Sequence, residues 1–430
     1  MFTGAPVRGA NPVVLFVVTV LWAWLRVPEA ARDTLWAEDG RDFLADSAAA
    51  SAGSLWATPY AGYLHLLPRV IADAVTASVD VEQWALAMTA ASCLTVGVVA
   101  VVVWACTADL VTSPSARGAL ALTPVLLPVV SVEVLGNVAN LHWFLLWVTP
   151  WVLLHRPRTR VGVVLATLGL FVVGATEIQA VLFVPLLLWG WRDARRWPAR
   201  GALLAGLVAQ AVAAVSSPRE EIAGAPGSLA DLVTGYLVNV PGGALWADAS
   251  SVGEIADGRL WLLALAALPF VAAGAWVLLR GTALQRVAAL TLLGGSMGAY
   301  AGAYLANGYH RAFYSTWGPA EWEAFSFSRY GVVPGMLLVA LLPLALGVAL
   351  GRRRRFAAVV LGLLLAVVTL VQVVQTGSVD GARAAGPEWA GGADAVVEQC
   401  ETGQAEAVAP IAPGGPWTIT LPCSYVEAHD

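Results

Sequence analysis

The sequence predicts an all-α polytopic membrane protein with about eleven transmembrane helices. Of its 430 residues, 58% are hydrophobic and only 12% are charged, and the mean hydropathy is +0.72. Apolar runs recur along most of the chain, each near the roughly 20 residues that span a bilayer. Arginine clusters separate these runs, and the sequence contains no lysine. The sequence pI near 5.6 argues against nucleic-acid binding.

Charge placement predicts the orientation, because loops rich in arginine stay in the cytoplasm. With those loops inside, the N-terminus is cytoplasmic, the C-terminus is outside, and nearly all carboxylates fall outside. The arginine clusters are Arg156, Arg158 and Arg160; Arg192, Arg195, Arg196 and Arg200; Arg280 and Arg286; and residues 352–355. The expected spans are 12–30, 84–106, 118–134, 141–154, 161–175, 178–191, 201–216, 260–279, 287–305, 332–350 and 356–375.

Two stretches with basic residues at both ends are expected to fold as short hairpins. A single helix between Arg160 and Arg192 would be about 47 Å long, which exceeds a bilayer. We therefore place a tip at residues 175–177 and a second tip at 133–140. Residues 11–28 are interpreted as a retained helix and not as a signal peptide, because no small-residue cleavage site precedes the loop that follows.

The predicted organisation is a membrane domain over residues 1–375 and a small outer tail over 376–430. The first outer loop, 31–83, carries an acidic motif and an amphipathic stretch at 64–75 that suits a helix on the membrane surface. Further outer loops are expected at 217–258 and 306–331. Cys400 and Cys423 both fall in the tail, where a disulfide fits an oxidising compartment.

Glu38, Asp39 and Asp42 directly follow the first helix and are the candidate catalytic carboxylates. Acids at a membrane interface are costly if they face lipid, which favours a functional role over a merely solvated loop. A carboxylate here could deprotonate an acceptor hydroxyl, and partial burial would raise its pKa toward a useful range. Asp39 is the preferred base, Glu38 is the other candidate, and Asp42 is assigned to substrate binding.

The two hairpin tips carry the other polar candidates for substrate binding. These are Glu133, Asn137, Asn140 and His142 at one tip and Glu177 at the other. The competing interpretation of the asparagines is helix capping.

Cations that could bind a phosphate lie near the outer ends of helices. They are Arg69, with His65 one turn away, Arg329, with Tyr330 beside it, and Arg311. Snorkelling to lipid headgroups is the alternative role for these arginines. The carboxylates and histidines could also bind a divalent metal, although no spacing specifies one.

This arrangement resembles the GT-C superfamily of membrane glycosyltransferases. A cytoplasmic N-terminus, a first helix, an outer loop that opens with Glu38-Asp39, a surface helix at 64–75 and about ten further helices match that superfamily's topology. The resemblance implies a polyprenyl-phosphate-linked sugar donor, a glycan, lipid or protein acceptor outside the plasma membrane, and a carboxylate of the acidic pair as catalytic base. The chain departs from many members in its short tail and in the Asn137 and Asn140 motif.

Two other functions remain open from the sequence. A transporter or flippase of a lipid-linked saccharide would place polar residues near the midplane of the membrane, whereas here they gather at outer tips. A polysaccharide polymerase or ligase would use arginines and a histidine of a late outer loop, and His310, Arg311 and Arg329 occupy such a loop.

Overall fold

The computed structural model describes residues 11–219, 225–308, 312–376 and 381–429. The main helices and strands are α1 (Pro12–Arg26), α2 (Glu29–Arg32), α3 (Ala45–Ala49), α4 (Leu66–Thr76), α5 (Trp84–Cys106), α6 (Pro114–Leu126), α7 (Val130–Glu133), α8 (Leu141–Leu154), α9 (Arg160–Gly174), α10 (Trp197–Ser216), α11 (Leu229–Leu237), α12 (Gly243–Leu245), α13 (Ala249–Arg280), α14 (Ala283–Ala303), α15 (Pro319–Glu323), α16 (Val332–Val339), α17 (Leu341–Gly351), α18 (Arg355–Val374), α19 (Trp389–Glu401), β1 (Glu406–Pro410), β2 (Thr418–Pro422) and α20 (Cys423–His429). Residues Ile178–Leu188 form a 3-10 helix, and Asp39–Leu44 form a π-helical turn.

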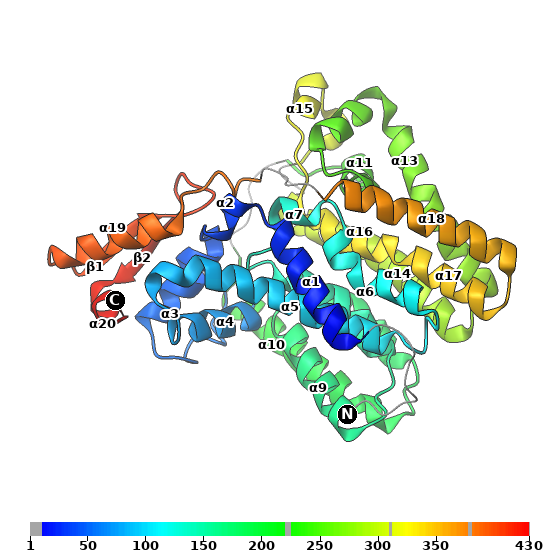
Figure 1. The fold of residues 1–430 in the computed structure, drawn as a ribbon, viewed down its shortest axis with the longest axis horizontal. Helices are drawn as coiled ribbons and strands as arrows, with labels where there is room; N and C mark the ends of the chain where they lie inside the picture. Colours follow the sequence, from blue (N-terminus) through cyan, green and yellow to red (C-terminus); the bar gives the residue numbers. More distant parts are fainter. Residues whose placement is uncertain (1–10, 220–224, 309–311, 377–380, 430) are drawn as a thin grey trace.

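The fold is helical, and its long helices have the composition of membrane spans (Figure 1). Within the described ranges, five helices are long and apolar enough to cross a membrane. They are Val81–Cys106, Ala194–Ser216, Ala249–Arg280, Arg329–Gly351 and Arg355–Val374. Shorter apolar helices cover Pro12–Arg26, Leu141–Leu154, Arg160–Gly174 and Ile178–Leu188. The class expected from composition, an all-α membrane protein, agrees with this architecture.

Helix boundaries follow local signals that the sequence carries. Asn11 caps α1 by accepting a hydrogen bond from the amide of Val13, and Pro12 occupies the first helical position, where no amide is needed. The helix ends at Arg26 and not at residue 30, because Pro28 interrupts it. Pro128 follows the end of α6 in the same way, so the expected span 118–134 is a helix over Pro114–Leu126 followed by the short α7.

The interior of the bundle is built from α8, α16 and α17, whose side chains are almost all buried. Trp147 and Trp151 of α8 are fully buried there. The surrounding helices expose large apolar side chains instead; in α18, Phe356 and Val374 are exposed. An apolar exterior around a packed apolar interior is the pattern of a helix bundle surrounded by lipid.

Hydrogen bonds and ion pairs join several loops that are far apart in the sequence. The arginine-rich loops contact one another through an ion pair between Arg158 and Asp109 at 2.6 Å, an ion pair between Arg156 and Asp193 at 2.7 Å, and a hydrogen bond from Gln285 to the carbonyl of Leu110. The loops expected on the other side are joined by bonds from Val138 to Asp39, Leu66 to Ala175, Arg219 to Asn307, Arg329 to Glu133 and Ser315 to Asp231. Each of these contacts joins loops that arginine placement assigns to the same side, and the orientation of the chain in a membrane stays a prediction.

The C-terminal tail packs on the first loop, beside α3 and α4 (Figure 1). Its antiparallel strands β1 and β2 form a two-stranded sheet, a feature absent from the expected all-helical organisation. A disulfide joins Cys400 and Cys423, as the sequence suggested. Trp389 is buried and stacks on Trp84. The tail thus shares its core with the membrane domain.

Candidate functional site

Asp39 is buried and fully occupied by backbone donors. Its two carboxylate oxygens accept hydrogen bonds from the amides of Val138 and Ala139, at 2.8 and 2.6 Å, and only 1% of the residue is exposed. Burial raises the pKa of Asp39 to about 7, although the two amides and the charge of Arg383 act in the opposite direction. The carboxylate therefore ties the acidic loop to the hairpin tip at 133–140.

Arg383, from the tail, braces the same junction. Its buried guanidinium donates to the carbonyl of Gly136, to the hydroxyl and carbonyl of Thr34, and to the hydroxyl of Thr89. Gly136 has a φ of +86°, and a Cβ there would lie 2.6 Å from Val27, so glycine is required at this close approach. Three distant segments thus fix the position of Asp39.

Glu38 is the partly exposed member of the acidic pair. Its carboxylate interacts electrostatically with the guanidinium of Arg329 and with the phenol of Tyr60. Burial, and then the charge of Glu38, raise the pKa of Tyr60. Of the two candidate bases, Glu38 is the carboxylate that keeps access to a second molecule.

Asp42 is paired with its neighbour on the same turn. The Arg41 guanidinium lies 3.0 Å from the Asp42 carboxylate and also stacks over the ring of Trp417 in the tail. Burial raises the pKa of Asp42, while the bond from Arg41 opposes this shift. Asp42 therefore lies in the candidate site as one half of an ion pair with Arg41.

Arg329 brings a cation to the acidic loop. Its guanidinium lies 2.5 Å from the carboxylate of Glu133 and over the ring of Tyr330. The ring of Tyr330 packs against that of Trp143, which joins this pair to α8. The structure thus brings together Glu38, Glu133, Arg329 and Tyr330, which the sequence had placed in three different segments.

The asparagines of the hairpin tip brace its backbone. The side chain of Asn137 donates to the carbonyl of Glu133, and its oxygen accepts from the amide of Asn140. Asn140 in turn accepts from the indole of Trp143 at 3.2 Å. Asn140 stands at the N-cap of α8 but makes no side-chain capping bond to the helix, so helix capping is not its role. Contact with a substrate stays a prediction for both residues.

A second polar group lies where the two hairpin tips meet. The Nδ1 atom of His142 hydrogen bonds to the carboxylate of Glu177, and the other oxygen of Glu177 accepts from the amide of Gln179. The His142 ring lies 5.8 Å, centroid to centroid, from that of His65. His142 and Glu177 are therefore neighbours, as their positions at adjacent tips suggested.

Arg69 has a different environment from the one expected. It is buried, donates to Asp46 at 3.0 Å and to the carbonyl of Thr58, and lies over the ring of Phe43. The Nε and Nη1 atoms of Arg69 hold these partners inside the protein, so phosphate binding by Arg69 stays a prediction and the proposal below uses Arg329. The other expected cation, Arg311, lies outside the described residues, as does His310.

Tyr60, Tyr63 and Arg383 belong to the site but were missed from the sequence. Tyr60 and Tyr63 exchange backbone hydrogen bonds across a turn in which Ala61 and Gly62 have positive φ. The Ala-Gly pair between two tyrosines is the only sequence signal for this turn. Nothing local marks Arg383, because its partners lie up to 349 positions away.

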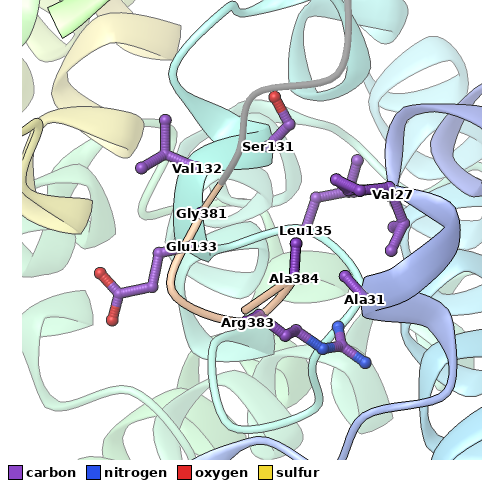
Figure 2. A pocket seen from close by; sticks show the side chains of 10 residues that line it. Val27, Ala31, Ser131, Val132, Glu133, Leu135, Gly381, Arg383 and Ala384 are labelled. Atoms are coloured by element: carbon purple, nitrogen blue, oxygen red, sulfur yellow. The ribbon is translucent and has the colours of Figure 1, made fainter. Parts of the chain in front are cut away.

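The structure also shows a pocket beside the carboxylate cluster (Figure 2). It lies between the end of α1, α7 and tail residues 381–384, and Glu133 and Arg383 are among its lining residues. In Figure 2 the Glu133 carboxylate and the Arg383 guanidinium point to opposite sides. In the part of the chain that the structure describes, no three histidine, cysteine or acidic side chains converge to hold a metal ion.

Comparisons with protein-family models, with curated proteins and with solved structures found no match to this chain.

Proposed function

We propose that this protein is a GT-C-type membrane glycosyltransferase that takes a sugar from a polyprenyl-phosphate donor. One observation carries the proposal: a partly exposed carboxylate, Glu38, interacts electrostatically with a cation, Arg329, from a segment far away in the sequence. A donor held in the membrane needs a cation for its phosphate, and an acceptor hydroxyl needs a base. Both groups belong to the contact network of the predicted outer loops.

In the proposed reaction, Glu38 takes the proton of the acceptor hydroxyl as its oxygen attacks the anomeric carbon. The bond from that carbon to the phosphate oxygen breaks, and the phosphate leaves with the electron pair. Arg329 stabilises the developing phosphate charge, since the planar fork of arginine suits phosphate oxygens. Asp39 is a positioning residue in this scheme. This assignment differs from the sequence preference for Asp39, because both of its oxygens are already occupied.

The proposed topology has about eleven crossings, with the N-terminus in the cytoplasm and both the site and the C-terminus outside. Five long apolar helices and four shorter ones overlap the expected ranges, which supports the proposal, while the range 118–134 is broken between α6 and α7. Single cysteines introduced at Arg353 and Gln404 of a chain lacking Cys93 and Cys106 provide a test. Only the cysteine at residue 404 is expected to react with a membrane-impermeant maleimide on intact cells. Labelling at residue 353 would reject this orientation.

Two runner-up functions give different products. A polymerase or ligase is favoured by the central position of Arg329, a residue of the late outer loop, and would transfer a glycan from a lipid pyrophosphate. A flippase would move the lipid-linked saccharide between leaflets of a proteoliposome without breaking a bond. The proposed enzyme instead releases polyprenyl monophosphate from a monophosphate-linked sugar.

The test uses the purified full chain in nanodiscs with polyprenyl-phosphate mannose, glucose and arabinofuranose, each radiolabelled in the sugar, and cell-envelope extract as acceptor. Transfer of label from at least one donor, with release of polyprenyl monophosphate, is expected. If the same protein in proteoliposomes moves all three donors between leaflets, while no donor is cleaved in the nanodiscs, the flippase is favoured and the transferase is rejected.

A further inference from the structure

A buried imidazole beside the proposed site has no internal partner. His65 is 97% buried, and neither of its ring nitrogens forms a hydrogen bond within the described part of the chain. Its neighbours are rings: Tyr63 at 4.3 Å, Tyr60 at 5.5 Å and Phe43 at 5.6 Å between centroids. A buried polar group without a partner is destabilising, so a position that keeps one is a candidate for contact with a ligand.

Burial, with the charges around it, favours the neutral form of the His65 ring. Burial lowers its pKa well below the usual value, and the charges of His142, Arg69 and Arg329 act in the same direction. Glu177, hydrogen bonded to His142, and Glu38, which interacts with Arg329, are the nearby acids, and the phenols of Tyr60 and Tyr63 pack on the ring. A neutral imidazole offers one N–H donor and one acceptor nitrogen.

That combination matches a hydroxyl group, which can both donate and accept, whereas an ionised phosphodiester can only accept and would leave the acceptor nitrogen without a partner. The aromatic rings around His65 add faces of the kind that pack against the apolar side of a sugar ring. Next to it, the bond to Glu177 fixes the orientation of His142, so that its Nε2 atom is the ring nitrogen left for a second polar contact. A sugar ring has several hydroxyls to satisfy both imidazoles.

We propose that His65, together with the His142–Glu177 pair and the rings of Tyr60 and Tyr63, forms the subsite that binds the hydroxyls of the donor sugar. The subsite is separate from the phosphate contact at Arg329. This inference rests on the proposed function and adds the place where the sugar is recognised.

The turn at 60–63 covers His65 and supplies the route of entry. Its ends are joined by two backbone bonds, at 2.8 and 3.1 Å between Tyr60 and Tyr63. Gly62 packs against Arg219, where an added Cβ would lie 3.0 Å from the Arg219 amide nitrogen. Displacement of this short turn would expose the imidazole face to a ligand without changing any helix of the bundle.

The test measures binding of two probes to the full chain in nanodiscs: sugar-free polyprenyl phosphate, and the same lipid phosphate carrying mannose, glucose or arabinofuranose. The wild-type protein is expected to bind at least one sugar-bearing lipid about tenfold or more tightly than the sugar-free lipid. His65→Phe keeps the ring volume but removes both polar atoms, and it is expected to abolish that difference while leaving affinity for the sugar-free lipid unchanged. His65→Asn, which keeps one donor group and one acceptor, is expected to restore part of the difference.

The outcomes separate this inference from the proposed function. If His65→Phe retains the preference for the sugar-bearing lipid, or weakens both probes equally, the subsite is wrong. The same conclusion follows if the wild type does not distinguish any of the three sugars from the bare lipid phosphate. If the wild type binds none of the lipids, or if Arg329→Ala binds the sugar-free lipid as well as the wild type, the proposed function itself fails.

Discussion

The guanidinium of Arg329 lies 2.5 Å from the carboxylate of Glu133, although 196 positions separate the two residues in the sequence. The ion pair connects the start of the candidate span Arg329–Gly351 to the hairpin tip that also holds Asp39. It holds a cation that interacts electrostatically with Glu38 and keeps that cation paired before any anionic ligand binds. An incoming phosphate would therefore share Arg329 with Glu133.

Arg329→Ala is expected to weaken binding of polyprenyl phosphate by roughly 10- to 100-fold, since a hydrogen bond to a charged group contributes about 1.5–3 kcal/mol. Arg329→Lys should recover only part of the affinity, because a point charge loses the bidentate geometry. Lipid binding in nanodiscs measures both. The matched control, Arg352→Ala, removes an exposed arginine of a predicted cytoplasmic loop. Equal affinities in Arg329→Ala and the control would contradict the assignment.

Asp39 should make folding stability depend on pH in a defined window. Folding raises its pKa from 3.8 to about 7, which favours the protonated acid in the folded chain. Its stabilising contribution is therefore complete below a pH of about 4 and is lost as pH rises through about 7, a change on the order of 4 kcal/mol. Thermal melts between these pH values should show less pH dependence in Asp39→Asn than in the wild type. Parallel pH profiles would show that Asp39 does not titrate in this window.

Arg383 is expected to be essential for the fold of the acidic loop. Arg383→Ala leaves buried carbonyls of Thr34 and Gly136 without their donor, so a loss of roughly 3–5 kcal/mol in stability is expected. Arg286→Ala, at an exposed arginine, should change stability by about 0.5 kcal/mol or less. Denaturation of the purified variants compares the two. A small effect at Arg383 would mean that the tail is not integral to this junction.

Two of the four cysteines should be available for alkylation and the other two should be protected by their disulfide. Cys400 and Cys423 are bonded to each other, whereas Cys93 and Cys106 are free and buried. In denaturant without reductant, mass spectrometry after alkylation should find label at Cys93 and Cys106 only, and at all four cysteines after reduction. A Cys93→Ala/Cys106→Ala chain should take up label only after reduction. Label on Cys400 before reduction would contradict the pairing.

The sequence predicts the helices well and the contacts between them poorly. A run of about 20 apolar residues in a membrane has few alternatives to a helix, and five helices of the described residues are long and apolar enough to be such spans. The expected span 118–134 is instead divided into α6 and the short α7. A span was expected at 260–279, but α13 begins earlier, at Ala249. Its backbone is non-helical at residues 257–259, just before the expected start of the span. The alternation in β1 and β2 covers only five residues each, too short to indicate strands within a polar tail.

The sequence predicted many of the residues in the candidate site but not the contacts between them. Acids and histidines at helix ends were recognisable because polar residues are rare in this chain. Which of these side chains can contact a substrate depends on partners from other segments. Asp46 forms an ion pair with Arg69, and the amides of Val138 and Ala139 donate hydrogen bonds to Asp39. The role of Arg383 could not be predicted for the same reason, because 247 positions separate it from its partner Gly136.

The most direct test of the central claim is the rate of sugar transfer by Glu38→Gln. The donor is the polyprenyl-phosphate sugar that the wild-type chain uses, and saturating donor isolates the turnover step. Loss of a positioned base predicts turnover about 10²- to 10⁴-fold below the wild type with little change in donor affinity. Glu82→Gln, at an exposed acid of the same predicted outer loop and outside the site, is the matched control and should lose far less. Wild-type turnover in Glu38→Gln would contradict the account.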